Sequence, residues 1–148
     1  MLRLSKKSVL ALEAVLDVAH NARMSPVQSK EITERQGIPH RYLEQVMQRL
    51  VRVGILKGVR GPRGGYMMAR PTAEVTVGDI VRIVNEVDPD DDTTVSQSEL
   101  GQKVVGPLWA EIEQNILTWF DDITVADLSD MAERRGIVPM QMARRMAV

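Results

Sequence analysis

The sequence predicts a mainly α-helical protein with a small β-hairpin wing: a winged helix-turn-helix followed by a long C-terminal dimerisation helix. Two patterns predict this fold class. Three helical segments precede a strand–turn–strand segment within the first 72 residues, and a longer helical segment follows an acidic stretch. We therefore expect a DNA-binding region at 1–72, and dimerisation or regulatory helices at 73–135 that include an acidic loop at 88–101. Residues 136–148 are expected to form a flexible tail.

Three helices are expected from the spacing of apolar side chains and from the residues at the helix ends. The first covers 5–21 with a serine N-cap, and the second covers 29–36 and stops at Gly37. The third covers 39–53, with Pro39 at the first helical position, where proline loses no hydrogen bond. The face of the third helix that we expect to be buried is Leu43, Val46, Met47 and Leu50.

The hairpin is indicated by its turn residues. Residues 55–59 and 66–68 have the composition of strands, and the Gly- and Pro-rich segment 60–65 between them is typical of a turn. The order of three helices and a hairpin is that of a winged helix-turn-helix.

Three more helices are expected after the hairpin. Thr76 and Asp79 resemble a capping box, with Asp in the place of Glu. The longest helix is expected over 102–120, and a short last helix begins at Thr124. The tail beyond Gly136 has no such signals.

Charge is divided unequally between the two halves of the chain. Residues 1–70 carry 13 lysines and arginines against 5 acidic residues, a balance of +8. Residues 71–148 carry 6 against 15, a balance of −9. A basic half beside an acidic half indicates that only one region contacts a polyanion such as DNA.

The composition excludes several classes of site. The chain has no cysteine, which rules out disulfides, thiolate metal sites and thiol catalysis. The chain has two histidines, His20 and His40, which are too few for a typical zinc site. We expect His20 to lie at the end of the first helix without a special role. Neither an apolar run of membrane-spanning length nor a signal-peptide pattern is present. We expect a cytoplasmic protein with no cofactor, no metal and no membrane partner.

The expected DNA-binding residues lie on the third helix, on the hairpin turn and before the first helix. An α-helix fits the major groove, where Arg41, Glu44 and Gln45 are the side chains we expect to read bases. An arginine on a narrow glycine-rich turn suits the minor groove, and lysines at a helix start suit phosphates. The whole expected set is Lys6, Lys7, Pro39, His40, Arg41, Tyr42, Glu44, Gln45, Gln48, Arg60, Gly61 and Arg63.

None of these features is specific to DNA binding when taken singly. The polar helix face and the arginines of the turn could simply be solvated. Glycines beside basic residues can hold a phosphate in an enzyme, but the chain has no P-loop motif and no dinucleotide-binding glycine motif, and we expect no enzyme. A winged-helix protein-interaction adaptor is the alternative function, because a fold does not determine a function. Binding to heparin or random duplex, with its salt dependence, distinguishes the two.

An apolar stripe on the longest expected helix predicts a homodimer. The stripe consists of Val105, Leu108, Trp109, Ile112, Ile116 and Trp119. Such a stripe can instead pack on the core of its own chain. A helix of this length in a small protein more often pairs with a second copy, and palindromic operators require two-fold dimers.

Several segments together resemble the Rrf-type family of bacterial winged-helix transcriptional regulators (IscR-, NsrR- and CymR-like). The segments that carry the resemblance are Leu4-Ser5-Lys6-Lys7, Glu34-Arg35-Gln36-Gly37-Ile38, Tyr42-Leu43-Glu44-Gln45, Arg60-Gly61-Pro62-Arg63-Gly64-Gly65-Tyr66 and Val77-Gly78-Asp79-Ile80. The similarity is weaker beyond these segments and extends to about residue 130. It implies a dimeric DNA-binding regulator, here expected to be a repressor, in which Arg60 enters the minor groove and Glu44 faces bases.

The chain departs from the family at its cofactor site. Many members of the family carry three cysteines in the loop before the long helix, which hold an iron–sulfur cluster, but this chain has none. Val104 stands near the place of the last cysteine, and Gly106 stands where a histidine ligand can occur. We therefore expect no cluster. Some family members that lack the cluster are controlled by a partner protein, so a regulatory partner protein is also expected.

The acidic loop has the ligand spacing of an EF-hand. Asp88, Asp90, Asp92, Thr94, Ser96 and Glu99 occupy positions 1, 3, 5, 7, 9 and 12 of a twelve-residue segment. Thr93 at the position that requires glycine, and the stiff Pro89, argue against calcium. A solvated acidic loop, a divalent-cation site and a contact for a basic partner all remain open.

Overall fold

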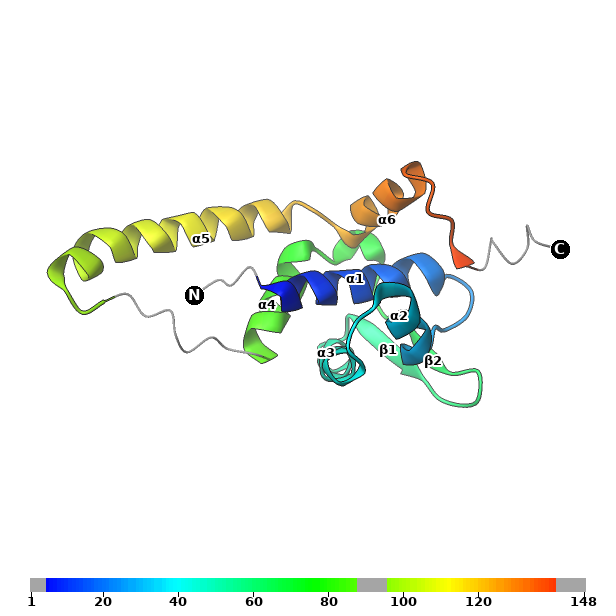
Figure 1. Ribbon diagram of the computed structural model, residues 1–148. Coiled ribbons are helices and arrows are strands. Elements are labelled where there is room, and N and C mark those ends of the chain that lie inside the picture. Colours follow the sequence, from blue (N-terminus) through cyan, green and yellow to red (C-terminus); the bar gives the residue numbers. More distant parts are fainter. Residues whose placement is uncertain (1–4, 88–95, 141–148) are drawn as a thin grey trace.

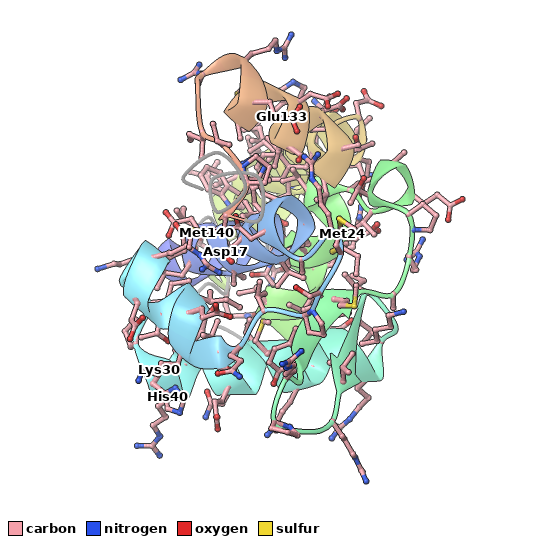
Figure 2. The ribbon with its side chains drawn as sticks, turned by 90° about the vertical axis from the view of Figure 1, so that its right-hand side faces the viewer. Asp17, Met24, Lys30, His40, Glu133 and Met140 are labelled. Carbon is pink, nitrogen blue, oxygen red and sulfur yellow. The ribbon has the colours of Figure 1, made fainter. Side chains whose placement is uncertain are left out.

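Helix α1 runs through the middle of the molecule and separates two groups of elements (Figure 1). The computed structural model describes residues 5–87 and 96–140. Helices α2 and α3 and the hairpin lie on one side of α1, and α5 and α6 lie on the other, as Figures 1 and 2 both show. The elements, in chain order, are α1 (Lys6–Asn21), α2 (Ser29–Gln36), α3 (His40–Arg52), β1 (Leu56–Val59), β2 (Gly65–Met68), the 3₁₀ turn η1 (Thr72–Glu74), α4 (Val77–Val87), the π-helical turn η2 (Gly101–Val105), α5 (Gly106–Asp121) and α6 (Val125–Arg134). The predicted fold class is confirmed.

One apolar core joins the first and second halves of the chain. Val15 of α1 and Leu50 of α3 are buried in the same cluster as Ile80 of α4 and Val125 of α6. Complete burial of a side chain of this kind contributes about 1.5–3 kcal/mol to folding. The expected division near residue 72 therefore does not separate two cores.

The helix starts that the sequence predicted after the hairpin are stabilised by reciprocal caps. The backbone N–H of Thr76 donates to Asp79 Oδ2 and that of Asp79 donates to Thr76 Oγ1, each at 3.0 Å. Thr124 and Asp127 repeat this arrangement at the start of α6, also at 3.0 Å. These contacts satisfy backbone donors that the first turn of a helix leaves without partners.

Two helix starts differ from the prediction. Pro39 is the N-cap of α3, with extended ψ of 128°, and the helix begins at His40 rather than at Pro39. The longest helix is already helical at Glu99 and contains the π turn η2, which ends two residues before Pro107. Proline lacks the N–H that would bond four residues back and its ring crowds that carbonyl, which explains the widened turn.

The segment after α6 packs on α1, which corrects the expectation for His20. The backbone N–H of Met140 donates to Asn21 Oδ1 at 3.0 Å, and His20 Nε2 lies 2.8 Å from the carbonyl oxygen of Ile137. His20 is buried and therefore does more than end α1. Residues 137–140 of the expected flexible tail thus contact α1, while 141–148 lie outside the described residues.

The acidic loop falls mostly outside the described part of the chain. Residues 88–95, with most of the EF-hand-like spacing, are not among the described residues. None of the helices in the two described stretches is long and apolar enough to cross a membrane.

Candidate nucleic-acid interface

Helix α3 has one buried and one exposed face, as the apolar spacing predicted. Leu43, Val46, Met47 and Leu50 are buried against the core. On the other face, these expected DNA-binding residues are exposed: Pro39, His40, Arg41, Glu44, Gln45 and Gln48. Helix α3 thus presents a row of donors and acceptors of the kind that reads base edges in the major groove.

Tyr42 links the start of α3 to the start of α1. Its hydroxyl donates to the carbonyl oxygen of Lys7 at 2.6 Å, and Lys7 Nζ lies 5.9 Å from the centre of the Tyr42 ring. Lys6 and Lys7 are both exposed there. The structure therefore brings the two lysines and the N-terminal end of α3 together.

The hairpin depends on two glycines that no other residue could replace without a shift. A Cβ at Gly65, where φ is +152°, would lie 2.2 Å from the carbonyl oxygen of Val27, and a Cβ at Gly64 would lie 2.1 Å from that of Val59. Val27 approaches so closely because it exchanges two backbone hydrogen bonds with Tyr66, at 2.7 and 3.1 Å. The loop before α2 is thereby attached to β2.

The tip of the hairpin carries the expected minor-groove residues. Arg60, Gly61 and Arg63 are exposed between β1 and β2, whose register pairs Val59 with Gly65. The hairpin and α3 lie on the same side of α1 (Figure 1). One side of the molecule thus combines an exposed polar helix with an arginine-bearing turn.

A buried ion pair holds α2 on α1. Arg35 donates twice to the Asp17 carboxylate, at 2.8 Å each, and Gln36 Nε2 donates to it at 2.8 Å. The Asp17 side chain is fully buried. Hydrogen bonding to Asp17 raises the pKa of Arg35 above its ordinary value. Because α2 precedes the turn into α3, this pair helps to orient the expected recognition helix.

Arg49 makes a contact that the sequence did not indicate, and Lys30 is an exposed basic residue outside the expected DNA-binding set. Arg49 of α3 donates to Glu86 of α4 at 2.7 Å and so holds the helix in place. Lys30 of α2 is exposed, and in Figure 2 it lies toward the same lower edge of the view as His40.

The apolar stripe on α5 does not pack on the core of its own chain. No residue of α5 is buried, and Leu108, Trp109 and Trp119 are 53%, 47% and 64% exposed. Val105, the last residue of η2, and Ile112 are exposed as well, and Ile116 is half-buried. Contiguous exposed apolar surface on a helix is typical of a protein interface.

The residues present do not fit a thiolate-ligated iron–sulfur cluster. The chain has no cysteine, Val104 is 56% exposed in η2, and Gly106 begins α5. Within 5–87 and 96–140, no three His, Cys, Asp or Glu residues are arranged to hold a metal ion.

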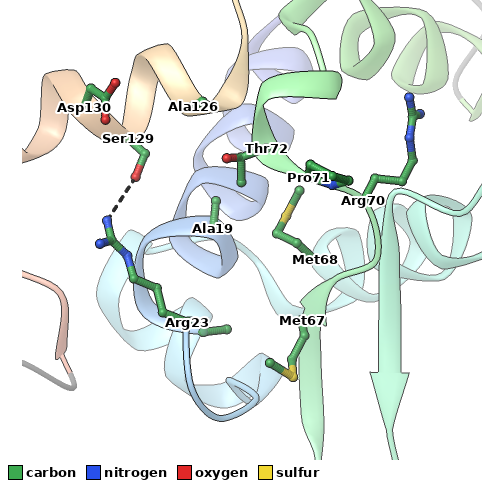
Figure 3. Close-up of a pocket in the computed structure, with 11 residues that line it drawn as sticks. Ala19, Arg23, Met67, Met68, Arg70, Pro71, Thr72, Ala126, Ser129 and Asp130 are labelled. Carbon is green, nitrogen blue, oxygen red and sulfur yellow. Dashed lines mark hydrogen bonds between the residues drawn. The ribbon is translucent and has the colours of Figure 1, made fainter.

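An open pocket of about 410 Å³ lies between the end of α1, strand β2 and α6 (Figure 3). Its guanidinium groups already have partners. Arg23 bonds to Ser129 at 3.5 Å and pairs with Glu133, and Arg70 donates to the carbonyl oxygen of Glu74 at 3.0 Å. We assign this pocket no ligand.

Comparison with known proteins gives a consistent result. Residues 4–131 match the Rrf2 family, described as an iron-dependent transcriptional regulator. The HTH-type transcriptional regulator IscR of Serratia proteamaculans is 36% identical over 132 residues, which are 86% of this chain and 79% of that protein. IscR of Klebsiella pneumoniae (strain 342) is 34% identical over 137 residues, 89% and 82% of the two chains.

Solved structures of regulators have the same fold. The structure of T. potens IscR has a TM-score of 0.73 at 32% identity and covers 96% of both chains. CymR, described as the global cysteine regulator of B. subtilis, has a TM-score of 0.70 at 27% identity over 88% of this chain and 98% of CymR. The chain therefore belongs to the Rrf2 family and is a DNA-binding, winged-helix transcriptional regulator.

Proposed function

We propose that the protein acts in the bacterial cytoplasm as a homodimeric repressor that binds a two-fold symmetric operator. The supporting observation is the side of the molecule that combines the exposed face of α3 with Arg60 and Arg63 at the hairpin tip. In this arrangement α3 enters the major groove and the tip approaches the adjacent minor groove. Lys6 and Lys7 then contact phosphates.

The dimer forms through α5 in this proposal. The exposed stripe that includes Leu108, Trp109 and Trp119 lies on the side of α1 opposite α3 and the hairpin. A two-fold contact through this stripe would leave both DNA-reading faces free, and the half-sites would lie one helical turn or a multiple apart. A dimer that occupies a promoter excludes polymerase, which is the basis for a repressor.

Control of the dimer does not pass through an iron–sulfur cluster in this proposal, because the chain lacks thiolate ligands. We propose instead a regulatory partner protein with a basic surface, supported by the balance of −9 over residues 71–148. No enzymatic reaction is assigned.

Binding of the full-length protein to genomic duplexes tests the proposal. Light scattering after gel filtration gives the mass of the free protein, and fluorescence anisotropy gives its affinity for selected fragments as salt is raised. We expect a dimer and a steep fall in affinity, with a log–log slope of about −0.9 per neutralised phosphate. A flat salt response, or no preference for any fragment, would contradict the proposal and favour an adaptor.

A further inference from the structure

His40 and Glu44 form an ion pair on the exposed face of α3. His40 Nε2 lies 3.3 Å from Glu44 Oε1, and the two side chains are 62% and 51% exposed. Residues four apart on a helix lie one above the other on the same face. The first turn of α3 therefore holds the carboxylate expected to face bases beside an imidazole.

Exposed charged residues also occur on the helices next to α3 and beside His40 on α3 itself. Lys30 and Glu34 of α2, the helix before α3, are both exposed. Arg41 follows His40 on α3, and Lys7 of α1 lies over the Tyr42 ring. Glu44 is the carboxylate that pairs with His40 in the described part of the chain.

The protonation state of His40 changes what Glu44 can do. An ionised carboxylate in the major groove accepts a hydrogen bond from the cytosine amino group and is repelled by bases that present acceptors. An imidazolium cation competes for the same carboxylate oxygens and reduces that repulsion. Histidine is the side chain that ordinarily changes charge between pH 5 and 8.

We propose that His40 is a positioning residue that sets how strictly Glu44 discriminates between bases, and that this discrimination depends on pH. With His40 neutral, Glu44 contacts the base and rejects the wrong base pairs. With His40 protonated, the ion pair withdraws the carboxylate and wrong base pairs are tolerated. This inference rests on the proposed function, because it requires α3 to enter the major groove.

The experiment compares affinities for matched operators at two pH values. The affinities of wild type and Glu44→Gln are measured for operators that each carry one base-pair change. The position at which the base preferences of the two proteins differ is the one that Glu44 reads. The discrimination ratio is the affinity for the preferred base pair at that position divided by the affinity for the wrong one. It is measured at about pH 6 and pH 8 at constant ionic strength, two values that span the range in which histidine ordinarily titrates. Phosphate contacts are the same for both operators and cancel in this ratio.

Three variants test the role of each side chain. For wild type we expect the discrimination ratio to rise about threefold to tenfold from the lower to the higher pH. This change is a part of the discrimination against a wrong base that one side-chain contact provides. His40→Gln should give a ratio that does not change with pH, and Glu44→Gln a low ratio at both values. Lys30→Gln, which removes an exposed positive charge from α2 and keeps both members of the ion pair, should leave the pH dependence intact.

The failures can be told apart. Specific binding by wild type with a ratio independent of pH, or a pH dependence that persists in His40→Gln, would overturn the role of His40 and leave the proposed function standing. Absence of sequence-specific binding in wild type and in every variant would overturn both.

Discussion

Arg60 at the hairpin tip and Arg41 at the start of α3 are exposed guanidinium groups on different elements of the proposed DNA-binding side. Replacing either by Ala should weaken operator binding by about 1–3 kcal/mol, because each would lose a groove contact. Anisotropy titrations at fixed salt measure this change.

A suitable control is Arg70→Ala. Arg70 is exposed and its guanidinium donates to the carbonyl oxygen of Glu74, so the variant removes the same charge away from α3 and the tip. Its effect should stay below about 0.5 kcal/mol, the usual range for a surface substitution. Equal losses in all three variants would indicate that only net charge matters.

Asp121 at the end of α5 accepts two hydrogen bonds from Arg82 of α4, at 2.6 and 2.8 Å. These bonds lower the pKa of Asp121 below its ordinary value of 3.8. The pair therefore stabilises the fold above pH 3.8, and this contribution disappears as the pH falls through the lower pKa of the folded state. Because both side chains are well exposed, the contribution is at most about 1 kcal/mol.

Urea unfolding of wild type and Asp121→Asn at several pH values measures this contribution. We expect the variant to be less stable near neutral pH and the difference to vanish in strong acid. Asp122→Asn, at the neighbouring exposed carboxylate, is the control and should show a smaller difference. A difference that stays constant down to the lowest pH would contradict the assigned role of Asp121.

At the scale of the element, the position of the hairpin depends on the close contact between its backbone and Val27. Gly65→Ala should displace β2 from Val27, because the new Cβ would lie 2.2 Å from the Val27 carbonyl oxygen at a φ that disfavours other residues. We expect a loss of at least about 1 kcal/mol in stability together with weaker DNA binding.

Gly58→Ala is the matched control within the same hairpin, because a Cβ at Gly58 meets nothing within 4 Å. Chemical denaturation and anisotropy should show little change in this variant. If Gly65→Ala bound DNA as tightly as Gly58→Ala does, the hairpin would have no role in recognition.

Helix α5 is the element whose exposed apolar side chains the proposed dimer would cover. Trp109→Lys should weaken the dimer by about 2 kcal/mol or more, as is usual for a buried aromatic side chain at an interface. Since no residue of α5 is buried, the monomer should keep its helical circular dichroism. Sedimentation measures the mass, and operator binding should weaken because the two half-sites are no longer linked.

Gln114→Lys introduces the same charge on the opposite side of α5 and should leave the dimer intact. If Trp109→Lys and Gln114→Lys had the same mass in sedimentation, the apolar stripe would not be the dimer interface.

At the scale of the whole molecule, the chain lacks the thiolates that usually hold an iron–sulfur cluster, while its family is described as iron-dependent. Protein purified without oxygen should be colourless and free of stoichiometric iron and sulfide, because thiolates are the usual ligands of such clusters. A visible spectrum and iron analysis test this, and an iron chelator should not change operator affinity. Stoichiometric iron and sulfide would require ligands other than cysteine.

The sequence alone determined the local elements and the fold class. The Thr76–Asp79 cap, the end of α2 at Gly37 and the buried face of α3 were predictable, because each signal acts within about one turn of helix. The glycine-rich turn between 60 and 65 likewise indicated the hairpin. The exposed set on α3 followed from the same periodicity.

Only the tertiary structure decided which distant residues meet. Asp17 and Arg35, Arg49 and Glu86, and His20 and Ile137 are separated by 18, 37 and 117 positions, and no local pattern links the members of a pair. The packing of 137–140 on α1 and the exposure of the α5 stripe depend likewise on how whole helices are placed. Helix periodicity identifies an apolar face but not what covers it, because its own core and a second copy of the chain are equally apolar partners.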